Sequence, residues 1–254
     1  MAVRTYPLRA LVLRRTKLGE SDVIVTLLSS QGSQVRAVAK GARKPTSSFA
    51  SRLEVYAECD LLLSQGKSLD LVKEARLVQA HEYLRTTLDP MQAAAPMVEL
   101  LDRTTQAGLE DDRLYDMTST ALSALENLDE QHLSAITAAH LLKTLAMLGF
   151  LPRFDMCVCC GEHQDLASMG DRIAFSLIDG GIVCSRCRTD SETMLFEKQV
   201  LMWAQALLFS PFSEIREMPL ENRIVFEILR FLQLWVKQHI GVNLKSLSFL
   251  IAQS

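Results

Sequence analysis

Six cysteines are the residues of this sequence whose spacing most directly suggests chemistry. Four of them form two pairs with a two-residue gap, Cys157 with Cys160 and Cys184 with Cys187, and 23 residues separate the pairs. A two-residue gap lets both sulfurs of a tight turn face one metal ion, and Zn²⁺ prefers four thiolates in a tetrahedron. Gly161 directly follows Cys160 and accepts the positive φ of such a turn. The spacing predicts one Zn²⁺ held by Cys157, Cys160, Cys184 and Cys187.

The other candidate ligands fit this pattern less well. Cys159 is adjacent to Cys160, and adjacent cysteines rarely point at one metal ion, so we expect Cys159 to be a bystander. His163 stays open as a replacement for one thiolate. Cys59 stands alone in a strand-like run and is predicted to be a small buried residue. Because four thiolates close the coordination shell, the metal is expected to be structural rather than catalytic.

Catalytic patterns are missing from the sequence. Gly66-Lys67-Ser68 resembles the end of a phosphate-binding loop, but Leu61 stands where that loop needs its first glycine, and the segment lies between two predicted strands. The five histidines are dispersed, and neither HExxH nor GxSxG occurs. We therefore expect a binding protein and not an enzyme.

The sequence pattern of residues 1–80 is typical of a small β-domain. Five short β-type runs are separated by turn signals such as Gly19, Gly32 and Gly66. Such a set predicts a closed sheet of the size of the oligonucleotide-binding (OB) barrel, with a β-sandwich fragment as the rival. The predicted strands are Leu8–Arg15, Val23–Leu28, Gln34–Lys40, Leu53–Leu63 and Leu69–Ala75.

From His81 onward, apolar residues recur at spacings of three and four, which predicts helices. Within this region, His140, Trp203 and Trp235 are expected to be packing residues. A hairpin over residues 173–184 is expected to bring the second cysteine pair to the first. The predicted helices include 94–101, 114–128, 136–148, 196–209 and 220–240. The predicted fold class is thus α+β: an N-terminal five-stranded OB-fold barrel (1–80), followed by an all-α domain (81–254) that carries a four-cysteine zinc element at about 153–190.

The composition is that of an ordinary soluble protein, with 48% hydrophobic and 22% charged residues in 254. No apolar run approaches the roughly 20 residues of a membrane-spanning helix, and no signal peptide is evident at the N-terminus. We therefore expect a cytoplasmic location, where closely spaced cysteines hold metal more often than they form disulfides.

Charge is distributed unevenly along the chain. The net charge of −3 combines +6 in residues 1–80 with −9 in the remainder. A basic module on an acidic body suggests a polyanionic partner, although a solvated surface has the same charge. The candidate nucleic-acid-binding residues lie in and around the first and third predicted strands and the loop that follows: Arg14, Arg15, Lys17, Arg36, Lys40, Arg43, Lys44 and Arg52. Phe49 and Tyr56 either stack on bases or pack in the barrel.

The order of these parts resembles the bacterial DNA-repair mediator family RecO over essentially the whole chain. The resemblance is carried by LRALVLRRTKLGESDVIVTLLSSQGSQVRAVAKGARK from Leu8, LGFLPRFDMCVCCG from Leu148 and GGIVCSRC from Gly180. Cys159 and Arg188 depart from the family pattern. The resemblance implies an OB barrel on a helical domain with a zinc element, binding to single- and double-stranded DNA, and annealing of complementary strands without ATP.

The same resemblance implies RecR and the C-terminal tail of the single-stranded DNA-binding protein SSB as partners. The expected outcome is the loading of RecA on SSB-coated DNA, in association with the nucleoid. A different class of function also remains open, namely a zinc-ribbon adaptor whose basic barrel binds an acidic protein or RNA.

Overall fold

A computed structural model describes residues 4–126, 129–188 and 192–253. The chain divides into two compact units, residues 1–127 and 128–254. Leu128, the last residue of one predicted helix, lies outside the described residues. Within the described residues, no helix is long and apolar enough to cross a membrane.

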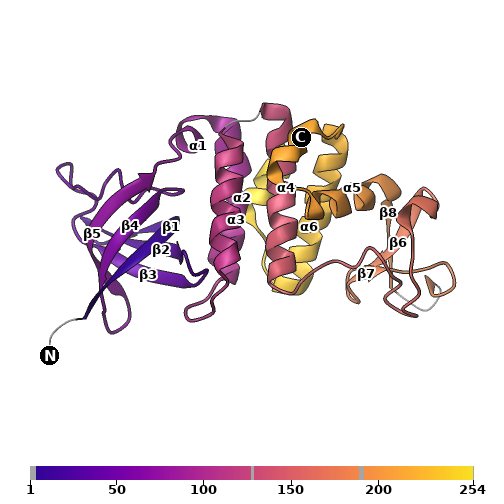
Figure 1. Cartoon of the computed structure of the whole chain (residues 1–254), viewed down its shortest axis with the longest axis horizontal. Helices are drawn as coiled ribbons and strands as arrows, with labels where there is room; N and C mark the ends of the chain where they lie inside the picture. The colour runs from indigo at the N-terminus through magenta and orange to yellow at the C-terminus, as the bar shows by residue number, and fades with distance from the viewer. Residues whose placement is uncertain (1–3, 127–128, 189–191, 254) are drawn as a thin grey trace. The chain divides into compact units, whose positions relative to one another are not determined.

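The first unit begins with a closed five-stranded barrel (Figure 1). Its strands follow the order β1-β2-β3-β5-β4, and all neighbours are antiparallel except β3 and β5. The strands are β1 (Thr5–Leu18), β2 (Asp22–Ser29), β3 (Gln34–Ala39), β4 (Glu58–Ser64) and β5 (Asp70–Gln79). The barrel confirms the predicted fold class and excludes the β-sandwich.

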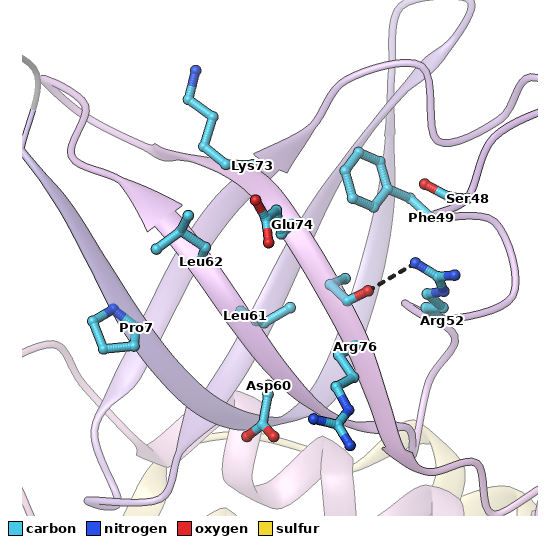
Figure 2. Close-up of a pocket in the computed structure, with 11 residues that line it drawn as sticks. Pro7, Ser48, Phe49, Arg52, Asp60, Leu61, Leu62, Lys73, Glu74 and Arg76 are labelled. Carbon is cyan, nitrogen blue, oxygen red and sulfur yellow. Dashed lines mark hydrogen bonds between the residues drawn. The ribbon is translucent and has the colours of Figure 1, made fainter.

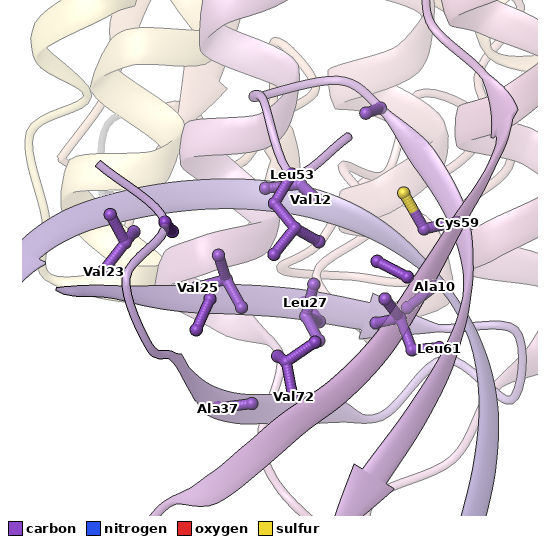
Figure 3. Close-up of a cluster of buried hydrophobic side chains, with 14 of the residues drawn as sticks. Ala10, Val12, Val23, Val25, Leu27, Ala37, Leu53, Cys59, Leu61 and Val72 are labelled. Carbon is purple, nitrogen blue, oxygen red and sulfur yellow. The ribbon is translucent and has the colours of Figure 1, made fainter. Parts of the chain in front are cut away.

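The barrel core follows from the alternation of side chains along the strands. Val23, Val25 and Leu27 of β2 point inward and are buried, together with Val12 of β1 (Figure 3). Cys59 is also fully buried, as predicted.

The predicted start of the fourth strand at Leu53 is wrong. Residues 53–57 form turns in which Tyr56 has a φ of 72°, and β4 begins at Glu58. Leu53 nevertheless enters the core (Figure 3), so its apolar character reflected burial of a turn and not strand pairing.

Three helices complete the first unit: α1 (Tyr83–Thr86), α2 (Leu88–Thr104) and α3 (Asp112–Leu125). Helices α2 and α3 both contact β1 of the barrel. Asp111 caps α3, because its side chain accepts a hydrogen bond from the Arg113 backbone N–H. The domain boundary predicted at residue 80 falls between β5 and α1 and stays a prediction.

The second unit is a helical body with a small three-stranded sheet. The helices are α4 (Glu130–Met147), α5 (Lys198–Phe209), α6 (Asn222–Ile240) and α7 (Lys245–Ala252), with short 3₁₀ turns at η1 (Leu166–Ser168) and η3 (Phe212–Glu217). The sheet has the order β7-β6-β8, from β6 (Arg172–Ser176), β7 (Gly181–Ile182) and β8 (Met194–Glu197). The β6–β7 hairpin confirms the predicted one. The helix predicted from Phe196 begins two residues later, because Phe196 and Glu197 belong to β8 and pair with β6.

Aromatic rings join the small sheet to the helices of the second unit. The Phe175 ring centroid on β6 lies 5.3 Å from that of Phe231 and 5.9 Å from that of Trp235, both on α6. Trp235 is buried as predicted, and its indole N–H donates to the Phe150 carbonyl at 2.9 Å. His140 is also buried, and burial lowers its pKa to about 3. Trp203, in contrast, is only partly buried.

Candidate metal centre and nucleic-acid interface

Four cysteine sulfurs lie together at one end of the β6–β7 hairpin. The Sγ atoms of Cys157, Cys160, Cys184 and Cys187 all lie within 4.8 Å of one another. Cys159 is exposed and lies outside this group, as does His163. The structure therefore brings together the four cysteines that the spacing selected, and their donor set suits a metal ion.

Two tight turns present these sulfurs. In the first, the Gly161 N–H donates to the Cys157 carbonyl at 2.8 Å, and Gly161 has a φ of 72°. In the second, the Cys187 N–H donates to the Cys184 carbonyl at 3.1 Å. The Cys184 N–H donates in turn to the Cys157 sulfur at 3.3 Å. Such donation favours a thiolate, which is the form that binds metal.

The two turns are held together by the backbone. The Val158 N–H donates to the Ile182 carbonyl at 3.0 Å, which joins the first turn to β7. Gly181 allows this approach, because a Cβ at that position would lie 2.6 Å from Val158 Cγ1 and 2.7 Å from the Arg153 carbonyl oxygen. An Arg186–Glu162 ion pair adds a second, exposed link.

At the barrel, four of the eight predicted DNA-binding residues gather at one end of β1–β3. We call Lys17, Lys40, Arg43 and Lys44 the rim cluster. Lys17 pairs in register with Val23, which pairs with Ala39, the residue before Lys40. All four side chains of the rim cluster are exposed.

The loop that carries the rim cluster is fixed to the β1–β2 turn. The Arg43 guanidinium donates to the carbonyls of Gly19 and Glu20 at 3.2 and 2.9 Å. The Gly41 N–H donates to an Asp22 carboxylate oxygen at 2.8 Å, and this bond is the main cause that lowers the Asp22 pKa. The loop backbone is therefore held beside the β1–β2 turn, and of the four cations Arg43 is itself held by its guanidinium.

The remaining four predicted residues are placed differently. Arg14 and Arg36 lie in one row across the sheet, each in register with Thr26, and Arg14 forms a 2.9 Å ion pair with Asp102 of α2. Arg15 is paired with Glu54 and is only partly exposed. Arg52 lies beside β5, where its guanidinium donates to the Ala75 carbonyl at 3.0 Å.

Arg52 shares a surface groove of about 480 Å³ with two cations that sequence reasoning missed, Lys73 and Arg76 (Figure 2). Because Glu74 lies between them on β5, the strand has no run of positive charge from which a binding site could be predicted. Phe49 is half-buried against the barrel core and lines this groove, whereas Tyr56 is buried.

Comparison with known families agrees with the fold. A model of the recombination protein O N terminal matches residues 1–81, and one of its C terminal matches residues 85–248. The chain is 32% identical to a DNA repair protein RecO of Desulfitobacterium hafniense over 96% of this chain and 88% of the relative. It is 33% identical to one of Nocardioides over 96% and 98%, and 24% identical to one of Thermoanaerobacter over 98% of both. The chain belongs to the RecO family of DNA repair proteins.

Proposed function

We propose that this protein binds single- and double-stranded DNA through its barrel and anneals complementary strands without ATP. With RecR, it would help to load RecA on SSB-coated single strands at the nucleoid. The observation that carries the proposal is the rim cluster. Among the described residues, none of these four cations forms an ion pair. Lys40 and Lys44 lie near enough to the Asp22 carboxylate to help lower its pKa, but its hydrogen bonds come from Gly41 and Ser21, so the cations can still bind phosphates.

Annealing of this kind needs no catalytic group. Two phosphate backbones repel each other, and the cations at the barrel end reduce that repulsion while counterions are released. Base pairing then supplies the free energy that drives the reaction. The proposed activity is accordingly that of a binding protein and not of an enzyme.

We also propose Zn²⁺ as the metal of the four-cysteine group. In a tetrahedral site with Zn–S bonds of about 2.3 Å, sulfurs are about 3.8 Å apart, and the Cys160 and Cys184 sulfurs are 3.9 Å apart. Four thiolates occupy all positions of such an ion, so its role would be to hold the two turns together.

The partners RecR and SSB rest mainly on membership of the family. One feature of the second unit supports contact with the SSB tail: a cavity of about 420 Å³ on α5, lined in part by Met202, the half-buried Trp203 and Lys198. Such a cavity has an apolar wall beside a cation, and Trp203 offers a fluorescence signal for a titration with an SSB-tail peptide. Met202→Asp should abolish that signal if the peptide binds there.

An annealing assay tests the main proposal. Complementary oligonucleotides are mixed without ATP, and the protein is compared with Lys40→Ala/Arg43→Ala/Lys44→Ala. We expect the triple variant to anneal at least about tenfold more slowly. A control that removes three exposed cations of the second unit, Arg172→Ala/Arg216→Ala/Lys237→Ala, should keep the original rate. Equal rates for all three proteins would remove the rim cluster from the DNA site.

The alternative is an adaptor that binds an acidic protein or RNA through the same basic surface. Competition separates the two functions. If RNA of the same sequence displaces bound DNA at much lower concentration than unlabelled DNA does, the adaptor is favoured. If unlabelled DNA competes at least as well, the DNA-repair role is favoured.

A further inference from the structure

The groove beside Arg52 has a floor made of two cross-strand rows on the outer face of the barrel. In one row, Arg9 of β1, Asp60 of β4 and Arg76 of β5 are directly in register. Both Asp60 oxygens accept hydrogen bonds from Arg9, at 2.8 and 3.0 Å. One carboxylate therefore lies between two guanidinium groups, and the row carries a net positive charge.

The second row of the floor is largely apolar. Pro7, Leu62 and Glu74 occupy matching positions on β1, β4 and β5. Pro7 is exposed and Leu62 half-exposed. Both lie on the groove side of their strands (Figure 2), so an apolar surface lies directly beside the charged row. Glu74 is the one carboxylate in the groove lining that does not face Arg9.

A segment of the rim-cluster loop forms the wall of the groove. Phe49 packs against the barrel core with part of its ring surface exposed to the groove (Figure 2). Arg52 is fixed twice: its carbonyl accepts a hydrogen bond from the Cys59 thiol at 2.9 Å, and its guanidinium donates to the Ala75 carbonyl at 3.0 Å. A guanidinium has five donors, so others remain for a ligand.

The groove thus combines an apolar floor and an aromatic wall with three cations, Arg52, Lys73 and Arg76. Among the described residues, no ion pair engages Lys73 or Arg76. Arg76 contributes to the lowered pKa of Asp60, but both oxygens of that carboxylate accept hydrogen bonds from Arg9. The groove's volume of about 480 Å³ is in the range of sites that hold one small molecule. It is too small for a duplex, in which the flat faces of the bases are stacked on one another and cannot reach an aromatic side chain.

We infer that this groove takes one unstacked nucleotide of a single DNA strand. The base lies against the ring of Phe49, and the adjoining phosphates are bound by Arg52, Lys73 and Arg76. The inference rests on the proposed function and deepens it. The rim cluster binds any phosphate backbone, whereas the groove favours single strands over duplex.

Titrations with a fluorescein-labelled single strand and with the duplex of the same sequence test the inference. Lys73→Ala/Arg76→Ala should weaken single-strand binding about tenfold and duplex binding by less than about threefold. The matched control, Arg4→Ala/Lys67→Ala, removes two exposed cations of the same unit outside the groove lining and should change neither affinity by more than about threefold.

A second variant addresses the aromatic wall. Phe49→Leu keeps an apolar side chain against the barrel core but removes the ring, and should weaken single-strand binding by about fivefold or more with no effect on the duplex. Thermal melting of both variants verifies that they fold.

The outcomes separate the two levels of the account. Equal losses for single strand and duplex, or no loss in the groove variants, would overturn the groove's role. If the groove variants bind DNA as tightly as the unmodified protein while Lys40→Ala/Arg43→Ala/Lys44→Ala loses affinity for both single strand and duplex, the proposed function stands and the groove inference fails. If the unmodified protein binds neither form, both fail.

Discussion

Nε2 of His81 lies 3.2 Å from Oε1 of Glu58, and the two side chains are almost fully buried in the first unit. Glu58 also accepts hydrogen bonds from the Tyr115 hydroxyl at 2.8 Å and the Ser119 hydroxyl at 2.7 Å. The second ring nitrogen of His81 lies 3.1 Å from a Glu126 oxygen. This buried cluster joins β4 of the barrel to α3.

Removal of the Glu58 side chain should destabilise the protein strongly. Glu58→Ala leaves His81, Tyr115 and Ser119 with buried polar groups and lost partners, which costs about 3 kcal/mol. Urea unfolding followed by circular dichroism measures the change. The control Glu74→Ala removes an exposed carboxylate of the same unit and should change the free energy of unfolding by less than about 0.5 kcal/mol. Similar values for the two variants would show that the cluster contributes little.

The same carboxylate should make stability depend on acid pH. Burial raises the Glu58 pKa, but the hydrogen bonds from His81, Ser119 and Tyr115 outweigh it and hold the pKa below 4.5. The unfolded state then binds more protons than the folded state, so this contribution is full above pH 4.5 and is lost as pH falls through the folded pKa. As the pH is lowered from about 6 to 3, the free energy of unfolding should decrease more steeply for the unmodified protein than for Glu58→Gln. Parallel curves would contradict this assignment.

The cysteines should differ sharply in metal content. We expect one Zn²⁺ per chain by elemental analysis, kept by Cys159→Ser and lost by Cys184→Ser, which also destabilises the residues around the site. Full metal content in Cys184→Ser, or none in Cys159→Ser, would contradict the ligand set.

A side chain at position 181 should weaken the metal centre, although Gly181 is not itself a ligand. In Gly181→Ala the new Cβ would meet Val158 Cγ1 at 2.6 Å, so the first cysteine turn must shift. We expect a loss of about 1–3 kcal/mol and faster removal of metal by a chelator. Gly170→Ala is the control, because nothing lies within 4 Å of its added Cβ. Equal chelation rates in the two variants would show that the close approach does not support the site.

Local spacing and periodicity predicted much of this structure. Cys157 and Cys160 could be selected because a turn of two intervening residues has few geometries, and the hairpin that carries Cys184 has glycines at its turn. The start of β4 could not be predicted, because Leu53 is as apolar in a buried turn as in a strand.

The groove beside Arg52 could not be predicted from the sequence, for a different reason. Its rows depend on the register between β1, β4 and β5, which sets Arg9, Asp60 and Arg76 side by side although they are far apart in the chain. Packing of α2 against β1 likewise brings Asp102 to Arg14, although 88 residues separate them in the chain. The sequence shows which charged residues lie close together along one strand, but not which residues lie beside them on neighbouring strands.

The central claim is that the cations of the rim cluster bind DNA phosphates. Its most direct test is the salt dependence of single-strand affinity, measured by fluorescence titration of the unmodified protein and Lys40→Ala/Arg43→Ala/Lys44→Ala. We expect a slope of several units in log K against log salt for the unmodified protein, and a slope shallower by about 2 for the variant, since each single-strand phosphate contact contributes about −0.7. Undetectable or salt-independent binding, or identical slopes for the two proteins, would contradict the account.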